Sequence, residues 1–225
     1  MNEKYELTEE FEEIETWRKG WLQKIKVYRI RALRAFADVK IGDLGGFVET
    51  KQNLSNMGNA WVYGDAKVCD NAEVYDNARV RDNAWVYGDA RVCGDARVCG
   101  DARVCGDAEV YGNAWVYGNA EVCDNAKVYG NAEVCGDAKV CDNANIFWCS
   151  SIGSRHATTT MFRNKDSGIT VTCGCFMGTL EEFAGIVEKE HGENIFGKEY
   201  KLLIELAKIH FGLQDETKGE EENGI

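Results

Sequence analysis

The sequence predicts a mainly β protein, a parallel β-helix of about five 18-residue coils with a small α+β cap at its C-terminal end. Alanine occupies every sixth position from Ala60 to Ala144 without a gap. A valine stands two residues after each alanine, from Val62 to Val140, and Ile146 takes the last of these places. A Gly-Asp, Gly-Asn or Asp-Asn pair precedes the next alanine. Self-similarity at a fixed period indicates a repeat architecture.

Six residues suffice for one short strand and one corner. Successive side chains of a strand point to opposite faces, so the alanine and valine of each repeat share a side. That side is uniformly small and apolar, and we expect it to line the interior. The residue between them and the residue after the valine then face outward. Glycine, asparagine and aspartate tolerate the positive φ of a corner, and three corners close a triangular coil.

The outward side chains fall into columns, because residues 18 positions apart stack in adjacent coils. Face one shows Trp61, Arg79, Arg97, Trp115 and Glu133, beside Tyr63, Arg81, Cys99, Tyr117 and Cys135. Face two shows Lys67, Trp85, Arg103, Glu121 and Lys139, beside Cys69, Tyr87, Cys105, Cys123 and Cys141. Face three shows Glu73, Arg91, Glu109, Lys127 and Asn145, beside Tyr75, Cys93, Tyr111, Tyr129 and Phe147.

Face one carries the predicted ligand site, in which aromatic residues bracket arginines. Arginine forks match phosphate geometry, and aromatic rings stack on bases at about 1–3 kcal/mol each. A nucleotide or short oligonucleotide fits such a face. The predicted ligand-binding residues are Trp61, Tyr63, Arg79, Arg81, Arg97, Trp115 and Tyr117. The alternative is that tryptophan and arginine on neighbouring strands form ordinary cation–π pairs.

Face three is apolar along one column, formed by Tyr75, Tyr111, Tyr129 and Phe147. Such a patch is large for a soluble protein. We expect either the cap helices or a second copy of the chain to cover it, and a homo-oligomer is predicted.

Charge and cysteine content exclude several classes. The net charge of −12 argues against a protein that coats nucleic acid through its overall field. No run of about 18 apolar residues is present, and no charged-then-apolar leader, so we expect a cytoplasmic protein without a membrane span. Most of the ten cysteines occupy the slot after the valine, which favours reduced thiols. Cys105, Cys123 and Cys141 could hold a soft metal, and Cys173 and Cys175 have the wrong spacing for zinc. No metal or cofactor is predicted.

The corner aspartates and asparagines form rows along the coils. We interpret these rows as turn residues with stacked amides, the alternative being an acidic rod that imitates a nucleic-acid backbone.

Residues 1–58 are predicted to form an N-terminal cap. Residues 1–16 are acidic and residues 18–34 are basic, with a strand around Ile25–Leu33. The two halves are expected to neutralise each other, unless the basic strand binds an anionic partner. The Gly-rich segment Ile41–Val48 leads into the first coil, and Val48 and Leu54 suggest an imperfect coil before the regular ones.

The repeat spans 59–149, an α+β cap 150–213, and a disordered tail 214–225. Two strands are predicted at Thr158–Arg163 and Ile169–Cys173. A capping box from Thr179 to Glu182 begins a helix that runs to about His191. A second helix is predicted at about Lys198–Phe211. Its expected buried residues are Leu202, Leu203, Leu206 and Ile209 or Phe211.

Motifs on both sides of the repeat support a family resemblance. The segments Tyr28–Arg34, Gly42–Val48 and Asn53–Asn56 precede it. Phe162-Arg163, Cys173–Phe176 and Gly178–Phe183 follow it. Together with the Val-x-x-x-Ala-x repeat they resemble the hexapeptide-repeat, left-handed parallel β-helix proteins common in prophages and phages. The resemblance implies left-handed coils, a bacterial host cytoplasm and no catalytic residues.

Catalysis is not expected. Acyltransferases built on this helix need a general base, commonly a histidine beside the coils, but the repeat has no histidine and no insertion. His191 and His210 are expected to be structural, which leaves His156. The mixed outward slots also lack the flat threonine ladder of an ice-binding face. The prediction is a non-catalytic binding protein of counter-defence or accessory type, whose faces hold a nucleotide-like anion or a host defence protein. An oligomeric scaffold is the alternative, and an acyltransferase comes third.

Overall fold

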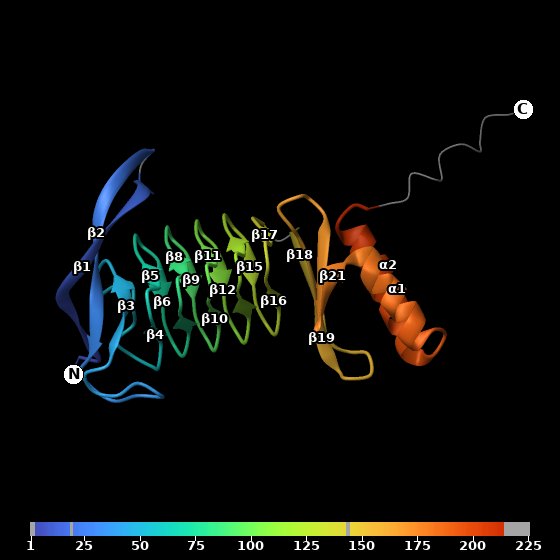
Figure 1. Ribbon diagram of the computed structural model, residues 1–225, viewed down its shortest axis with the longest axis horizontal. Coiled ribbons are helices and arrows are strands. Elements are labelled where there is room, and N and C mark those ends of the chain that lie inside the picture. Colours follow the sequence, from blue (N-terminus) through green and yellow to red (C-terminus); the bar gives the residue numbers. More distant parts are fainter. Residues whose placement is uncertain (1–2, 19, 143–144, 214–225) are drawn as a thin grey trace, which may run out of the picture.

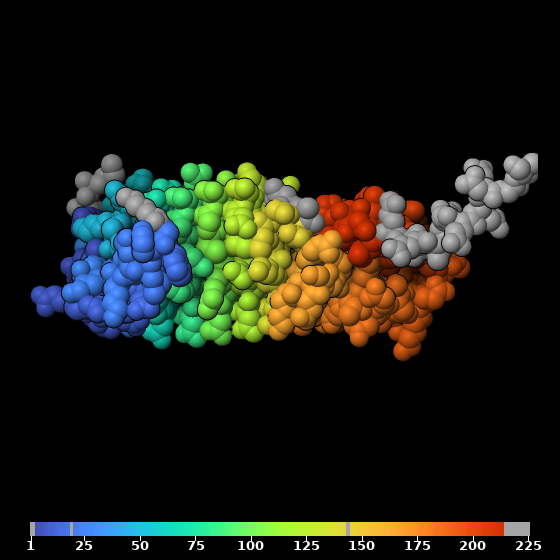
Figure 2. Space-filling view, turned by 90° about the horizontal axis from the view of Figure 1, so that it is seen from above, coloured from blue at the N-terminus to red at the C-terminus, as the bar shows by residue number. Residues whose placement is uncertain are grey.

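The computed structural model describes residues 3–18, 20–142 and 145–213 and shows an elongated molecule. An N-terminal β-hairpin, a solenoid of short strands, and a sheet with two helices follow one another along the long axis (Figure 1). Figure 2 shows the same three parts end to end, from blue through green to orange and red. The predicted tail 214–225 and the alanine at 144 lie outside the described residues.

The solenoid is built from two-residue parallel strands on three faces, as predicted. Face one contains β4 (Trp61–Val62), β7 (Arg79–Val80), β10 (Arg97–Val98), β13 (Trp115–Val116) and β16 (Glu133–Val134). Face two contains β5 (Lys67–Val68), β8 (Trp85–Val86), β11 (Arg103–Val104), β14 (Glu121–Val122) and β17 (Lys139–Val140). Face three contains β6 (Glu73–Val74), β9 (Arg91–Val92), β12 (Glu109–Val110) and β15 (Lys127–Val128). Arg79 pairs with Arg97, which confirms the 18-residue coil.

The core of the solenoid is the column of alanines and valines. Each of them between Ala60 and Val140 is buried. Their small, uniform side chains stack from coil to coil. In the coils before the last, the backbone N–H of an outward residue donates to the coil beyond, as Arg79 N does to Ala96 O at 2.9 Å. Interior packing and the parallel ladder therefore come from the same repeat.

The corners require a left-handed backbone, and at the glycine corners a side chain would press on the next coil. Gly100 has a φ of +71°, and a Cβ there would lie 3.0 Å from the backbone nitrogen of Gly118. Where aspartate takes this position it makes a bond of its own: Asp82 Oδ2 accepts from Gly100 N at 3.0 Å. Asn83 Nδ2 donates to Asp101 Oδ1 at 3.0 Å, one rung of an amide ladder. These contacts are what the turn-and-amide interpretation predicts.

The N-terminal part is an antiparallel hairpin of β1 (Tyr5–Arg18) and β2 (Trp21–Ala32), joined through β3 (Leu44–Val48) to the sheet of face two. The strand predicted around Ile25–Leu33 corresponds to β2, which begins four residues earlier. The sequence does not predict β1, because its many glutamates hide the alternation of a strand. Opposite charges face each other across the hairpin. The ion pairs are Glu10–Arg29 at 2.7 Å, Glu6–Arg31 at 3.3 Å and Glu15–Lys24 at 3.9 Å. The acidic and basic halves thus neutralise each other.

The predicted imperfect coil is present. Val48 pairs with Val68, and Leu54 forms a bridge to Val74, so each lies 20 residues before its partner instead of 18. Gly46 allows the close approach, because a Cβ there would lie 2.5 Å from the carbonyl oxygen of Ala66.

Buried polar groups close both ends of the tube. At the start, Lys4 is fully buried and its Nζ donates to Ala60 O at 2.9 Å. At the far end, Thr160 Oγ1 accepts from Glu133 N at 3.1 Å and Thr172 Oγ1 donates to Glu133 O at 3.4 Å. A solenoid exposes unpaired backbone groups at its ends, and these side chains satisfy some of them.

The C-terminal cap is an antiparallel sheet of β18 (Ile146–Ile152), β19 (Ala157–Arg163), β20 (Ile169–Cys173) and β21 (Phe176–Thr179), followed by α1 (Leu180–His191) and α2 (Ile195–His210). The capping box of Thr179 and Glu182 is present. The two predicted strands and both helices are confirmed.

The predicted buried face of α2 is partly wrong. Leu203 and Phe211 are buried as expected, but Leu202, Leu206 and Ile209 are 73%, 51% and 63% exposed. The buried side is formed by Tyr200, Leu203, Ile204 and Ala207. The helix carries apolar residues on two opposite sides, and the sequence pattern alone does not decide which side packs against the cap.

Candidate functional site

The arginine cluster of face one, formed by Arg79, Arg81 and Arg97, lies on β7, the residue after it and β10. Trp61 precedes it on β4 but is only 1% exposed, because Tyr5 and Phe36 of the N-terminal part cover it with ring centroids at 6.1 and 5.3 Å. The expectation that Trp61 faces solvent is wrong. Its ring belongs to the core and offers no stacking surface.

Asp38 is the residue at this site that sequence reasoning missed. Its Oδ1 accepts a hydrogen bond from the Tyr63 hydroxyl at 3.0 Å and lies 3.2 Å from Nη2 of Arg79. Burial works to raise the pKa of Asp38, but the bond from Tyr63 and the charges of Arg79 and Arg81 outweigh it, so the pKa lies below its usual range. Burial and the same hydrogen bond raise the pKa of Tyr63 to about 12. No periodicity marks Asp38, which lies outside the repeat.

Arg81 and Arg97 differ from Arg79, because neither forms an ion pair with any described residue. The guanidinium carbon of Arg81 lies 5.6 Å from the centre of the Tyr63 ring. Its Nε is buried and has no hydrogen-bond partner in the described part of the chain. Arg97 is exposed. Two arginines of the cluster therefore keep donors free.

Trp115 and Tyr117 form an aromatic pair one coil beyond Arg97. Their ring centroids are 4.7 Å apart at 41°. Trp115 is 37% exposed and its Nε1 donates to Cys99 Sγ at 3.1 Å, which fixes the indole. Burial and a bond with the Cys135 thiol raise the pKa of Tyr117. The structure thus pairs Arg97 with Trp115 and packs Trp115 against Tyr117, with Arg81 on the coil before Arg97. Trp61 is covered, and Tyr63 and Arg79 bind Asp38.

The aromatic column of face three meets the C-terminal cap. The rings of Tyr111 and Tyr129 stack with centroids 5.0 Å apart, and Trp148 of β18 meets Tyr129 edge-on at 4.4 Å. Phe147 lies 5.3 Å from the ring of His210 on α2. A hollow of about 440 Å³ lies here, lined by Tyr111, Lys127, Tyr129, Ile146, Phe147, Trp148 and His210. The cap therefore contacts the last part of this column. At the start of the column, a hydrogen bond with the Cys93 thiol and burial raise the pKa of Tyr75 to about 12.

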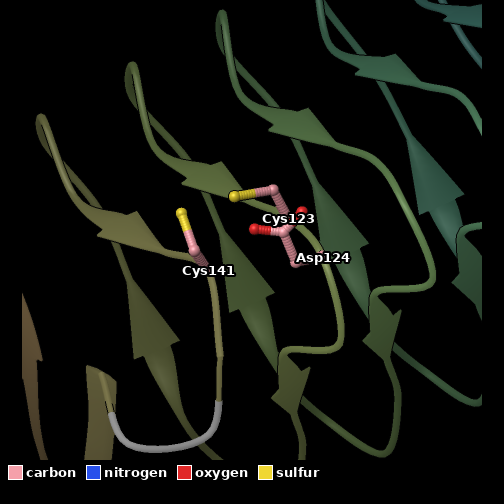
Figure 3. A group of neighbouring side chains, drawn as sticks. All are labelled: Cys123, Asp124 and Cys141. Carbon is pink, nitrogen blue, oxygen red and sulfur yellow. The ribbon is translucent and has the colours of Figure 1, made fainter.

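Cys123, Asp124 and Cys141 come together on adjacent coils at the end of face two (Figure 3). One sulfur or oxygen atom from each lies within 4.8 Å of the other two. Burial, and then the neighbouring Cys141 thiol, raise the pKa of Cys123, which keeps it protonated at neutral pH. The described residues supply three donors at this point, one fewer than a structural zinc site takes.

The three histidines lie in the cap, and His191 lines a hollow of about 360 Å³ together with Cys173, Cys175 and Tyr200. His191 stacks against Tyr200 with centroids 5.7 Å apart, and His210 packs edge-on to Phe211 at 4.9 Å, so both have aromatic packing partners. His156 is exposed in a turn, where its backbone nitrogen donates to Gly153 O at 3.1 Å.

The comparisons with known proteins define the structural class. Residues 72–88, 90–106 and 102–118 match the family model described as the YdcK beta solenoid repeat. The chain is thus similar to beta-solenoid repeat proteins over part of its coils, in agreement with its 18-residue turns. No curated protein matches the chain. Among the described residues, no helix is long and apolar enough to span a membrane.

Proposed function

We propose that this β-solenoid protein is a non-catalytic binding protein whose face one holds a small, nucleotide-like anion. The observation that carries the proposal is that neither Arg81 nor Arg97, on adjacent coils of face one, forms an ion pair or side-chain hydrogen bond with any described residue. In a chain of net charge −12, a carboxylate could easily have filled this position. Among the described residues, the acidic side chain that forms an ion pair with the cluster is Asp38, and its partner is Arg79.

The energetics favour an anion at Arg81. Because Nε is enclosed, an anion would meet Arg81 at its outer guanidinium nitrogens, where it would form charge-assisted hydrogen bonds. A phosphate can accept two parallel bonds from one guanidinium. Trp115 lies in register with Arg97 on the neighbouring strand, so a group linked to the phosphate can reach the exposed indole. Phosphate at the arginines and a ring on Trp115 together describe a nucleotide.

The biological setting follows from the resemblance to phage-type hexapeptide-repeat proteins. In such a setting we infer a counter-defence role in the cytoplasm of a bacterial host, with the bound anion being a nucleotide of that host. A host protein with an acidic surface is the competing partner for the same arginines.

The test is ligand-induced thermal stabilisation, measured with inorganic phosphate and a panel of mono-, di- and cyclic nucleotides. A nucleotide that binds should raise the melting temperature, and its Kd should then be measured by calorimetry. Arg97→Ala and Arg81→Ala should each weaken binding about tenfold or more, as loss of a charged hydrogen bond does. Arg103→Ala is the matched control, because Arg103 occupies the same repeat slot on face two and is also exposed.

The proposal fails if no nucleotide stabilises the protein, or if Arg103→Ala weakens binding as much as Arg97→Ala. Stabilisation by phosphate alone, with no further gain from nucleotides, would remove Trp115 from the site. The absence of catalysis is part of the proposal and has its own test. Acetyl-CoA turnover that disappears in His156→Ala would instead favour an acyltransferase.

A further inference from the structure

The helix α2 lies at the C-terminal end of the rod (Figure 1). Its exposed side carries an apolar stripe. Ile195, Leu202, Leu206 and Ile209 are 68%, 73%, 51% and 63% exposed. Their spacings of seven, four and three residues place them on one side of the helix. The opposite side is the one that packs into the cap core. Large aliphatic side chains exposed in a continuous row indicate an interaction surface.

None of the residues that the structure describes covers this stripe, and the composition of the sequence after α2 does not suit it. Residues 214–225, which follow α2, contain five acidic residues and only one large aliphatic residue, Ile225. An anionic membrane surface is also disfavoured, since the protein carries a net charge of −12 and amphipathic helices that bind such surfaces are rich in lysine and arginine.

Charge at the border of the stripe favours a second copy of the chain. Lys198 and Glu205 are seven residues apart, two turns of helix, and so lie along the same edge of the stripe. Lys198 forms no ion pair with any described residue. The partner of Glu205 is Lys208 at 2.9 Å, an exposed contact that leaves carboxylate oxygens accessible.

We propose that α2 is a homodimer interface, in which two copies of the helix pack antiparallel about a two-fold axis. With the axis near Lys201, each Lys198 lies beside Glu205 of the second copy, and the pair forms twice. The same axis brings Ile195 to within two residues, about 3 Å along the helix, of Leu206 of the second copy, and sets Leu202 close to its own counterpart. A two-fold contact must be self-complementary, and this edge is, because one end is basic and the other acidic. The two solenoids then extend away from the joined caps.

The interface is small. One helix pair buries less than the roughly 1,600 Å² of a standard stable interface, so we expect a reversible dimer with a Kd of about 1–100 μM. The measurement is sedimentation velocity on the full chain over a concentration series that brackets this range.

Four variants and one control test the proposal. Leu202→Glu should weaken dimerisation at least about a hundredfold, and the fold should persist because this side chain is exposed. Lys198→Glu and Glu205→Lys should each weaken it about tenfold, because each places like charges together twice. The double variant Lys198→Glu/Glu205→Lys should return the Kd to within about twofold of wild type. Leu44→Glu, an exposed leucine at the opposite end of the rod, should have no effect.

A monomeric wild type throughout the series would overturn the proposal. So would a dimer that survives Leu202→Glu, which would place the contact on another face. Failure of the double charge reversal to restore association would exclude the antiparallel pairing. Circular dichroism of each variant confirms that the cap is folded before its association constant is interpreted.

Discussion

The Tyr63 hydroxyl donates a 3.0 Å hydrogen bond to Asp38, and this contact joins the N-terminal part to the first face of the solenoid. The same carboxylate lies 3.2 Å from Arg79. Asp38 therefore both anchors the cap and neutralises one arginine of the proposed anion site. One side chain thus contributes both to the attachment of the N-terminal part and to the charge balance of face one.

Asp38→Asn should separate these two roles. Asparagine keeps an acceptor for Tyr63 but removes the charge, so anion affinity at Arg81 and Arg97 should rise about fivefold, the value of one nearby unit charge in water.

The free energy of unfolding of Asp38→Asn should fall only by a few tenths of a kcal/mol, as is typical of an exposed ion pair. Because the folded pKa of Asp38 is lowered, its stabilisation is present above the ordinary aspartate pKa and is lost as the pH falls through the folded value. Urea unfolding of wild type and variant should therefore differ at pH 7 and converge on acidification. A larger difference at acid pH would contradict the assignment.

Gly100→Ala should destabilise the solenoid by about 1–3 kcal/mol, since the new Cβ meets the next coil and the backbone must hold a positive φ. Gly185→Ala is the matched control. Gly185 lies in α1 with nothing within 4 Å of the position of a Cβ, so alanine should stabilise the helix by about 0.5–1 kcal/mol. Denaturant midpoints of the two variants should move in opposite directions. If both midpoints shifted in the same direction by the same amount, the corner at Gly100 would tolerate a methyl group.

Lys4 should give stability an unusual pH dependence. Burial, and then the charge of Arg34, lower its pKa to about 8, whereas an unfolded lysine titrates near 10.4. Between these values the unfolded chain binds more protons than the folded chain, so the contribution of Lys4 to the free energy of unfolding rises with pH. Other groups titrate in this range, and the quantity to measure is the difference between wild type and Lys4→Met. That difference should increase in favour of wild type from pH 8 to pH 10, and a constant difference would show that Lys4 titrates normally.

The Cys123, Asp124 and Cys141 cluster should not hold zinc tightly. Structural zinc takes four protein ligands, and three donors are present here, one of them an exposed carboxylate. Neither chelation nor added Zn²⁺ should shift the melting temperature by more than about 2 °C, because a site occupied far below its Kd adds little stability. A larger rise with Zn²⁺ that disappears in Cys123→Ser would disprove this expectation.

The repeat could be predicted from the sequence because the same local preferences for strand and corner recur in every six residues. Ala102 and Val104 can share only one side of a strand, and Gly100 can serve only as a corner, so the winding number and the columns followed by arithmetic. The capping box of Thr179 was equally local. These features depend on neighbours within a few residues or on positions 18 residues apart.

Contacts between unlike segments were decided by tertiary structure alone. Trp61 has the same sequence surroundings as Trp115, yet only Trp61 is covered, because the N-terminal part packs over the first coil and not over the fourth. Leu202 and Leu203 were equally plausible core residues, and the docking direction of α2 selected one of them. Asp38 lies in a turn between β2 and β3, and only the fold brings that turn to face one. A repeat fixes the interior and the register of a solenoid, since every coil supplies the same contacts, but whatever covers its faces depends on where the irregular ends of the chain come to lie.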